Sequence, residues 1–410
     1  MCILSSRKVL ATLVVLGALS AFAIKDLSAV ADIYSRRRSF SGVAGRAVYA
    51  KRSSAPLARS LAHYTMGIIY DNELKADKAA KEFEKVIRLD PDVSYVHTRL
   101  AADYFILKDT KKALEELKIA KALDPEDAKP SFIMALIYTS QNKFEDAGKE
   151  YREVMRLAPD SIWALSSLAD IYVLQEKMAD AADIYERLIE KDRESDLLYF
   201  TLGVIYSRMG KIDKGIEALN RAIKLNSEYL EAYISLGVIY EVKKDFDNAA
   251  LNLKKALEMA PDDPRVHFYL GVYYENINDN ASAAKHFRDA IRLDPYYADA
   301  YNYLGYMFAE DGVELDEALE LTKRAVALEP ENGAFLDSLG WALFKKGMTD
   351  EALMHIEKAL KAIPDDPTIR DHLGDIYFKQ GLSEKAREEW SKSLEFDPEQ
   401  EKVREKLKGR

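Results

Sequence analysis

The sequence predicts an all-α protein, a solenoid of about ten helix-turn-helix units stacked in chain order. Three observations lead to this fold. Hydrophobic residues make up 48% and charged residues 31% of the 410 residues, with only 12 prolines, as is typical of a folded, helix-rich chain. Prolines recur with a period of 34 residues, and one apolar pattern repeats in register with them. Such a period indicates repeats that bury their apolar faces against their neighbours.

The proline spacing sets the frame of the units. The intervals are 34 residues or a multiple of 34, except for one of 35, and the series is Pro91, Pro125, Pro159, Pro261, Pro295, Pro330, Pro364 and Pro398. A proline ends the second helix of a unit and starts the next turn, where its missing N–H costs nothing. The extra residue lies between Phe308 and Ala318. We expect it to lengthen a turn and leave the core frame unchanged.

Each unit repeats the same internal pattern. An apolar residue is followed by Gly or Ala, then by Tyr three residues later and by Ala nine residues after that. In the sixth unit these are Leu236, Gly237, Tyr240 and Ala249. Apolar positions at three- and four-residue steps predict two amphipathic helices per unit. The small residue lets the two helices approach closely, and the aromatic residue fills the space beside that contact.

Repeated ten times in phase over residues 60–400, this pattern resembles the tetratricopeptide repeat family. The resemblance implies a right-handed superhelical solenoid whose first helices line a concave groove. The last ten residues, 401–410, predict a polar capping helix that covers the final unit with Val403 and Leu407. Residues 301–375 also resemble a group of bacterial envelope tetratricopeptide proteins. Several of these are lipoproteins, and one type is the adaptor of a periplasmic C-terminal-processing protease.

Residues 1–23 have the plan of a targeting segment. Arg7 and Lys8 precede an apolar run from Val9 to Ala23 that ends in small residues, as in a secretory signal peptide. An uncleaved membrane anchor and an organelle transit peptide are the alternatives. The orientation stays open because residues 24–59, a basic linker, also carry positive charge. We expect an exported protein, periplasmic or anchored to the membrane of a bacterial envelope, with the linker either solvated or against an anionic membrane surface.

The charge distribution argues against nucleic-acid binding. Residues 1–59 carry ten Lys and Arg against Asp26 and Asp32, a net charge of +8, so the remaining 351 residues form an acidic body with a net charge of -18. Such a body lacks the cationic face that neutralises phosphates. The single cysteine, Cys2, excludes an intramolecular disulfide and a thiolate metal site.

The motifs predict no enzyme, no cofactor and no metal. His63, His97 and His267 occupy the fourth position of their units, where other units have Tyr, which indicates packing. His286 and His355 lie on second helices without a recognised carboxylate partner. The sequence contains no glycine-rich phosphate loop, G-x-S-x-G elbow or H-E-x-x-H pair. The stretch Asp371-His372-x-x-Asp375 lacks the third ligand that a metal would need.

The family resemblance places the second, fifth, ninth, twelfth and thirteenth positions of each unit in the groove. Along units two to seven the fifth and ninth positions are mostly apolar, among them Phe132, Phe200 and Phe268. Such a groove suits an amphipathic helix or an extended apolar segment, with packing between first helices as the alternative. The two-carboxylate clamp known in the family needs Lys and Asn early in the array, where this chain has Tyr64, Ile68, Thr98 and Ala102. We therefore do not expect that peptide specificity.

The last three units differ at the fifth and ninth positions, which are Asn302, Tyr306, Asp337, Trp341, Asp371 and Asp375. Residues four apart share a helix face, so each pair lies together. Two like charges at this spacing predict a site for a cationic partner, and Trp341 is the expected anchor of a protein interface. An ordinary solvated acidic face is the alternative.

The sequence thus predicts a non-catalytic scaffold or adaptor of the cell envelope that binds a protein or peptide in its groove. Two other hypotheses remain: a self-associating structural protein, and a membrane-anchored scaffold that faces the cytoplasm.

Overall fold

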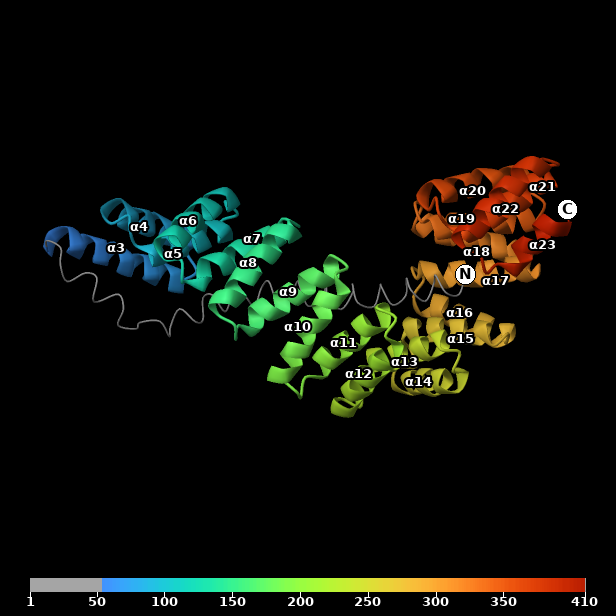
Figure 1. The fold of residues 1–410 in the computed structure, drawn as a ribbon, viewed down its shortest axis with the longest axis horizontal. Helices are drawn as coiled ribbons and strands as arrows, with labels where there is room; N and C mark the ends of the chain where they lie inside the picture. Colours follow the sequence, from blue (N-terminus) through green and yellow to red (C-terminus); the bar gives the residue numbers. More distant parts are fainter. Residues whose placement is uncertain (1–53, 410) are drawn as a thin grey trace. The chain divides into compact units, whose positions relative to one another are not determined.

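A computed structural model describes residues 54–409, and within them the chain forms twenty-one helices and no strand (Figure 1). The predicted all-α tetratricopeptide solenoid is confirmed. The predicted signal peptide or anchor of residues 1–23 lies outside the described residues, as does most of the predicted linker. None of the described helices is both long and apolar enough to cross a membrane.

Each repeat is a pair of helices of nearly constant length. The first helices are α3 (Ser54–Asn72), α5 (Ser94–Ile106), α7 (Ala128–Ser140), α9 (Ile162–Leu174), α11 (Asp196–Arg208), α13 (Leu230–Val242), α15 (Pro264–Asn276), α17 (Ala298–Asp311), α19 (Gly333–Lys345) and α21 (Pro367–Lys379). The second helices are α4 (Ala76–Leu89), α6 (Thr110–Leu123), α8 (Phe144–Leu157), α10 (Met178–Lys191), α12 (Ile212–Leu225), α14 (Phe246–Met259), α16 (Asn280–Leu293), α18 (Leu315–Leu328), α20 (Thr349–Ala362) and α22 (Ser383–Phe396). A last helix, α23 (Glu401–Gly409), follows them.

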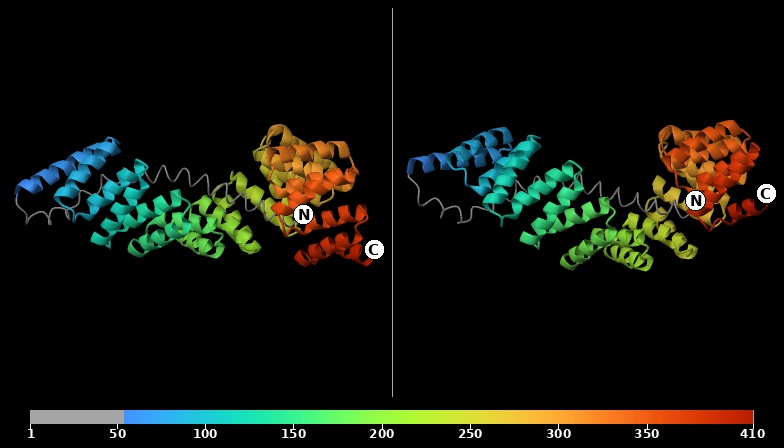
Figure 2. Two further views of the ribbon diagram at one scale, coloured as in Figure 1. Left: turned by 90° about the horizontal axis from the view of Figure 1, so that it is seen from above. Right: turned by 45° about the horizontal axis from the view of Figure 1, so that its top comes forward.

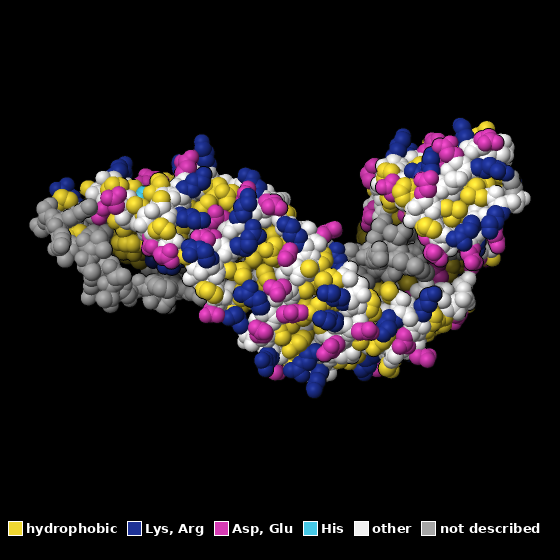
Figure 3. Space-filling model, in the orientation of Figure 1, with side chains coloured by type: hydrophobic (Ala, Val, Ile, Leu, Met, Phe, Trp, Pro, Cys, Tyr) yellow, Lys and Arg dark blue, Asp and Glu magenta, His cyan; other side chains and the backbone are white. Residues whose placement is uncertain are grey.

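The helices form two compact units that meet in the chain after Leu225. Repeats one to five make up the described part of the first unit, and repeats six to ten with α23 make up the second. Figures 1 and 2 show the helical hairpins of each unit stacked in chain order. On the face drawn in Figure 3, Lys and Arg are interspersed with Asp and Glu, as on a solvated protein surface.

The small residue of the repeat pattern marks the closest approach of the two helices. A Cβ atom added to Gly237 would lie 2.6 Å from Leu253 Cγ, and one added to Gly374 would lie 2.5 Å from Trp390 Cδ1. Any larger residue would therefore push the second helix away, because interiors are packed without spare volume. The spacing of the sequence pattern follows from this contact.

Both ends of the array differ from the regular repeat. The first helix begins at Ser54, before the predicted start at residue 60. Pro56 lies in its first turn, where proline is tolerated. At the other end, Val403 of α23 is 1% exposed and packs with Trp390, and Leu407 is partly buried beside them. The cap thus covers apolar surface that a further repeat would otherwise bury.

The extra residue of repeat eight lies in the turn between α17 and α18. Gly312 ends α17 with φ 71° and Glu314 precedes α18 with φ 44°. α17 is one residue longer than the first helices around it, and the two left-handed residues then turn the chain back into α18. The core positions of α18 therefore keep the register of the other repeats. Gly312 adopts this conformation without the steric cost of a side chain.

Candidate functional site

In repeats six to ten, a row of polar contacts links α13 to α15, α17 to α19, and α19 to α21. We call this row the polar ladder, and its members are Glu241, Asn276, Glu310, Asp337, Trp341, Asp371, His372, Asp375 and Lys406. Each contact joins one first helix to the next, except that the last joins α21 to the cap. All of these residues belong to the second unit.

Trp341 lies at the centre of the polar ladder. Its indole stacks on the imidazole of His372, with 4.0 Å between ring centroids and 14° between the planes. Its Nε1–H donates to Glu310 Oε2 at 2.9 Å. With only 7% of its surface exposed, Trp341 is not the exposed aromatic that its position in the sequence predicts. Side chains of α17 and α21 cover it because neighbouring first helices pack side by side.

Asp337 and His372 form a buried pair between α19 and α21. Asp337 is 3% exposed and His372 is 4% exposed, and His372 Nδ1–H donates to Asp337 Oδ1 at 2.8 Å. Burial by itself lowers the pKa of His372, but the Asp337 carboxylate outweighs burial and raises the pKa above the ordinary value. The pair therefore favours a protonated imidazole beneath Trp341.

Asp371 and Asp375 share a face, as their spacing predicts, and their cationic partner comes from the same chain. Lys406 Nζ of α23 donates to Asp371 Oδ1 at 2.7 Å and to Asp375 Oδ2 at 2.7 Å. Trp390 Nε1–H donates to the other oxygen of Asp375 at 3.2 Å. Burial raises the pKa of Asp371, and Lys406 opposes that rise. The two aspartates thus hold the cap in place. Because Lys406 of the same chain occupies them, they do not form a site that awaits a cation from outside the chain.

Asn302 and Tyr306, the remaining pair of the last three repeats, both lie on α17. Asn302 is 2% exposed and so belongs to the interior. Tyr306 is half-buried, and burial raises the pKa of its hydroxyl well above the ordinary value. Tyr306 also lines a pocket of about 330 Å³ together with Glu275, Asn276, Asn278, Asn280, Met307, Glu310 and Asp311.

The three phenylalanines proposed for an apolar groove have different environments. Phe268 is 2% exposed and lies among aromatic rings, including Phe287 at 5.9 Å and Tyr303 at 5.1 Å. Phe200 is 7% exposed. Phe132 is half-buried and meets Tyr151 edge-on at 6.1 Å. Phe268 and Phe200 therefore pack between helices, as in the alternative interpretation, and Phe132 keeps more exposed surface.

Glu241 and Glu275 are functional candidates that the sequence analysis did not single out. They occupy the twelfth position of repeats six and seven, on neighbouring helices α13 and α15. Glu241 Oε2 accepts from Asn276 Nδ2 at 2.6 Å, while Oε1 is buried and has no hydrogen-bond partner among the described residues. Burial raises the pKa of Glu241 to about 8, and the nearby Glu275 carboxyl adds to that rise. The signal was present, because the groove positions of the family include the twelfth.

A second missed group lies in repeat seven, where His267, His286 and Asp289 come together. The sequence predicts a packing role for His267 and no carboxylate partner for His286. Asp289, three residues after His286, shares its helix face and supplies that carboxylate. His267 is 8% exposed, in agreement with a packing role, but its ring also faces the other two side chains.

The fold and this packing define a tetratricopeptide repeat protein. The chain belongs to the family described as the C-terminal domain of cilia and flagella-associated protein 70, whose model matches residues 153–407. A tetratricopeptide repeat model matches residues 61–93 and 128–161. Among curated proteins, none is similar enough in sequence to count as a match.

Several solved structures are similar to this chain. One is the APC/C hetero-tetramer Cut9-Hcn1, at 14% identity and a TM-score of 0.49, covering 87% of this chain and 98% of the other. Another is yeast Tom70, at 18% identity and a TM-score of 0.43, covering 85% and 94%. The MamA protein has 25% identity and a TM-score of 0.38, covering 40% and 97%. Similarity at this level identifies neither a partner nor an activity.

Proposed function

We propose that this chain is a non-catalytic scaffold that holds a protein partner by a segment containing Lys or Arg, bound along α13, α15 and α17. Tetratricopeptide solenoids serve commonly as protein-binding scaffolds. The observation that carries the proposal is Glu241, a half-buried carboxyl beside a second carboxyl, Glu275; one oxygen of Glu241 has no partner in the part of the chain that the structure describes.

A cationic side chain fits this place for a physical reason. A carboxyl taken out of water is unfavourable when ionised unless an opposite charge or hydrogen bonds replace the water. Asn276 supplies one hydrogen bond to Glu241, and an ammonium or guanidinium would supply both the charge and further donors. The acidic pocket beside Tyr306 and Glu310 extends the same surface.

The chain contains its own example of such recognition. Lys406 lies between Asp371 and Asp375 on the first helix α21, at the fifth and ninth positions, whereas Glu241 and Glu275 occupy the twelfth position of their first helices. This contact supports the idea that carboxyls on first helices receive a lysine side chain. It also explains why we place the partner at repeats six to eight, since the cap already covers repeat ten.

Peptide binding to the full chain tests the proposal. We would measure fluorescence anisotropy with two labelled peptides of equal length, one built from Lys and Leu and one from Glu and Leu. The Lys/Leu peptide is expected to bind, and Glu241→Gln with Glu275→Gln is expected to weaken it by at least about tenfold. Glu258→Gln is the matched control, because Glu258 is exposed on the second helix of repeat six. Equal binding of both peptides, or unchanged binding by the double variant, would contradict the proposal.

The cellular role extends this proposal. The N-terminal sequence and the resemblance of residues 301–375 support an envelope adaptor, exported or membrane-anchored, that brings a bound protein to a second one. A reporter fused after Arg410 is expected to be active only outside the cytoplasm, and activity only inside would favour a scaffold facing the cytoplasm.

Crosslinked capture with mass spectrometry would identify the partner. Light scattering that gives a monomer at every concentration would count against self-assembly.

A further inference from the structure

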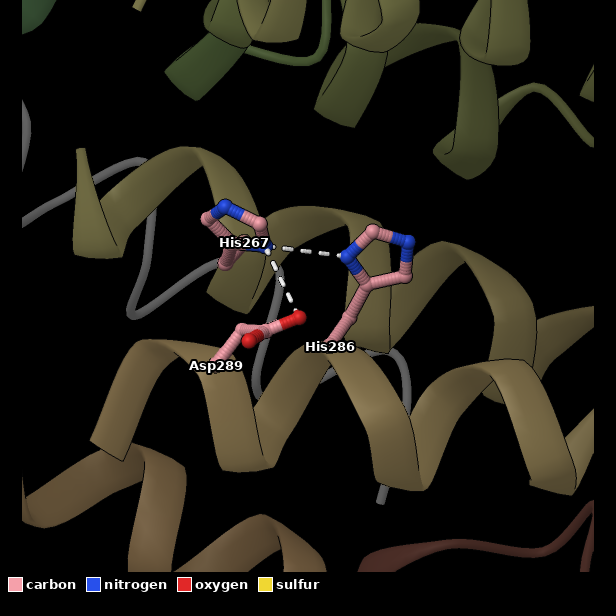
Figure 4. A group of neighbouring side chains, drawn as sticks. All are labelled: His267, His286 and Asp289. Atoms are coloured by element: carbon pink, nitrogen blue, oxygen red, sulfur yellow. Dashed lines mark hydrogen bonds and ion pairs between the residues drawn. The ribbon is translucent and has the colours of Figure 1, made fainter. Parts of the chain in front are cut away.

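The two helices of repeat seven bring three potential metal ligands to one place (Figure 4). His267 lies on α15, and His286 and Asp289 lie on α16. His267 Nδ1 is 3.1 Å from His286 Nδ1 and 3.9 Å from Asp289 Oδ2. One ligand atom from each residue lies within 4.8 Å of the other two. Two imidazole nitrogens and one carboxylate oxygen therefore converge across the helix pair.

Neighbouring contacts orient these atoms. His267 Nε2–H donates to the carbonyl oxygen of Pro261 at 2.9 Å, which leaves the lone pair on Nδ1, facing His286. Asp289 Oδ1 accepts from Arg292 at 3.1 Å, so Oδ2 is the oxygen that faces the histidines. The ring of His286 stacks on Tyr274 with 6° between the planes. Ligands held by a second layer of contacts in this way are typical of metal sites.

Other repeats have a different pair at this position. His63 contacts Glu82 at 2.6 Å, and His97 contacts Glu116 at 2.6 Å, with His97 Nε2 also on a proline carbonyl. Each of these pairs joins an imidazole to a carboxylate and is satisfied by one proton. In repeat seven the glutamate is replaced by His286, so two nitrogens meet instead. Without a metal, His286 Nδ1–H donates to His267; with one, both nitrogens become ligands.

We propose that His267, His286 and Asp289 bind one divalent late transition-metal ion, zinc(II) being the expected species, with water in the fourth position. Mixed nitrogen and oxygen ligands favour zinc, cobalt, nickel or copper, whereas magnesium and calcium take oxygen ligands. Ligand atoms around tetrahedral zinc are about 3.3 Å apart, so Asp289 Oδ2 must move closer to His267 by roughly half an ångström. His286 and Asp289 are half-buried, so their side chains have room for a shift of this size. The bound ion would join α15 to α16.

Zinc binding by the purified full chain tests the site. We would measure zinc stoichiometry by isothermal titration, the visible absorption of the cobalt(II) form, and the melting temperature against zinc concentration. The wild-type chain is expected to bind zinc, to give the absorption bands of four-coordinate cobalt, and to melt at a higher temperature as zinc increases. Magnesium is expected to have no such effect.

Variants that copy other repeats keep the fold while removing a ligand. His286→Asn introduces the residue that repeat six has at this position, Asn252, and His267→Tyr introduces the residue of repeats six and eight, Tyr233 and Tyr301. Each variant is expected to lose one zinc equivalent, or at least tenfold in affinity, with its cobalt bands. His355→Asn, at the equivalent position of repeat nine, is the control and should bind as the wild type does.

Three results would overturn the proposal: a wild-type chain that binds no zinc at tens of micromolar, zinc and cobalt binding that survives both His286→Asn and His267→Tyr, or a loss equal to theirs in His355→Asn. Circular dichroism of each variant separates ligand loss from unfolding. The site is independent of the acidic surface proposed for the partner, so the peptide experiment and this one can fail separately.

Discussion

The indole of Trp341 lies flat on the imidazole of His372, 4.0 Å away, and the same imidazole donates to the buried carboxylate of Asp337. The His372 ring thus has the Asp337 carboxylate at its edge and the indole of Trp341 on its face, and these two contacts join α19 to α21. A protonated imidazole is attracted to the face of an indole. The contact therefore depends on pH, and this gives the first prediction.

Asp337→Asn is expected to destabilise the second unit more at pH 6 than at pH 9. The folded pKa of His372 is raised, so the pair's contribution is fully present below the unfolded value of about 6.5 and is lost as pH rises through the folded pKa. Breaking a buried pair costs about 3 kcal/mol at the acidic end. Urea unfolding followed by tryptophan fluorescence at the two pH values measures this. Asp365→Asn, at an exposed position, is the control, and an equal loss at both pH values would contradict the expectation.

Lys406→Met is expected to loosen the cap. The ammonium is removed from between Asp371 and Asp375, which leaves two half-buried like charges together, at a cost of about 1–3 kcal/mol. Because burial already raises the pKa of Asp371, the cost should shrink as pH falls and the carboxyl takes up a proton. Hydrogen exchange of α23 measures the change. In an Asp371→Asn and Asp375→Asn background the same substitution should cost much less, and full additivity would disprove the coupling.

Gly374→Ala is expected to destabilise repeat ten by about 1–3 kcal/mol, because the new Cβ would lie 2.5 Å from Trp390. Gly148→Ala is the matched control inside a helix, where the nearest atom is 3.5 Å away. That substitution should be neutral or stabilise by up to about 1 kcal/mol, since alanine has the higher helix propensity. Thermal unfolding of both variants measures the difference, and similar losses in the two would show that close packing is not the cause.

Binding of the Lys/Leu peptide is expected to strengthen as pH rises from 6 to 9. Below its folded pKa of about 8, Glu241 carries a proton that a bound lysine must displace, so binding releases the proton and becomes tighter with increasing pH. The dependence can reach tenfold per pH unit for a single proton. Glu241→Gln should flatten the profile. Anisotropy titrations at four pH values test this, and an unchanged slope in Glu241→Gln would assign the proton to another group.

The sequence predicts the spacing of residues within a helix better than it predicts contacts between residues far apart in the chain. Spacing within one helix is enough to place Gly237 against Leu253 and to put Asp371 and Asp375 on one face, because the helix fixes the relative positions of residues three and four apart. The cap was predictable from Val403 and Leu407 for the same reason. In contrast, the lysine that occupies the two aspartates is 31 residues beyond Asp375. Its spacing carries no periodic signal.

The sequence by itself determined the repeat period, the helix pairs, the glycine contacts and the residues that fill each repeat. Only the tertiary structure decided that His372 covers Trp341 and that Lys406 neutralises Asp371 and Asp375. It also decided that Glu241 keeps a buried oxygen without a partner among residues 54–409, and that His286 faces His267 where repeats one and two have glutamate. The physical reason is common to all four. The helical period sets which face a side chain points from, whereas the side chain that meets it across a helix or repeat boundary depends on how the helices stack.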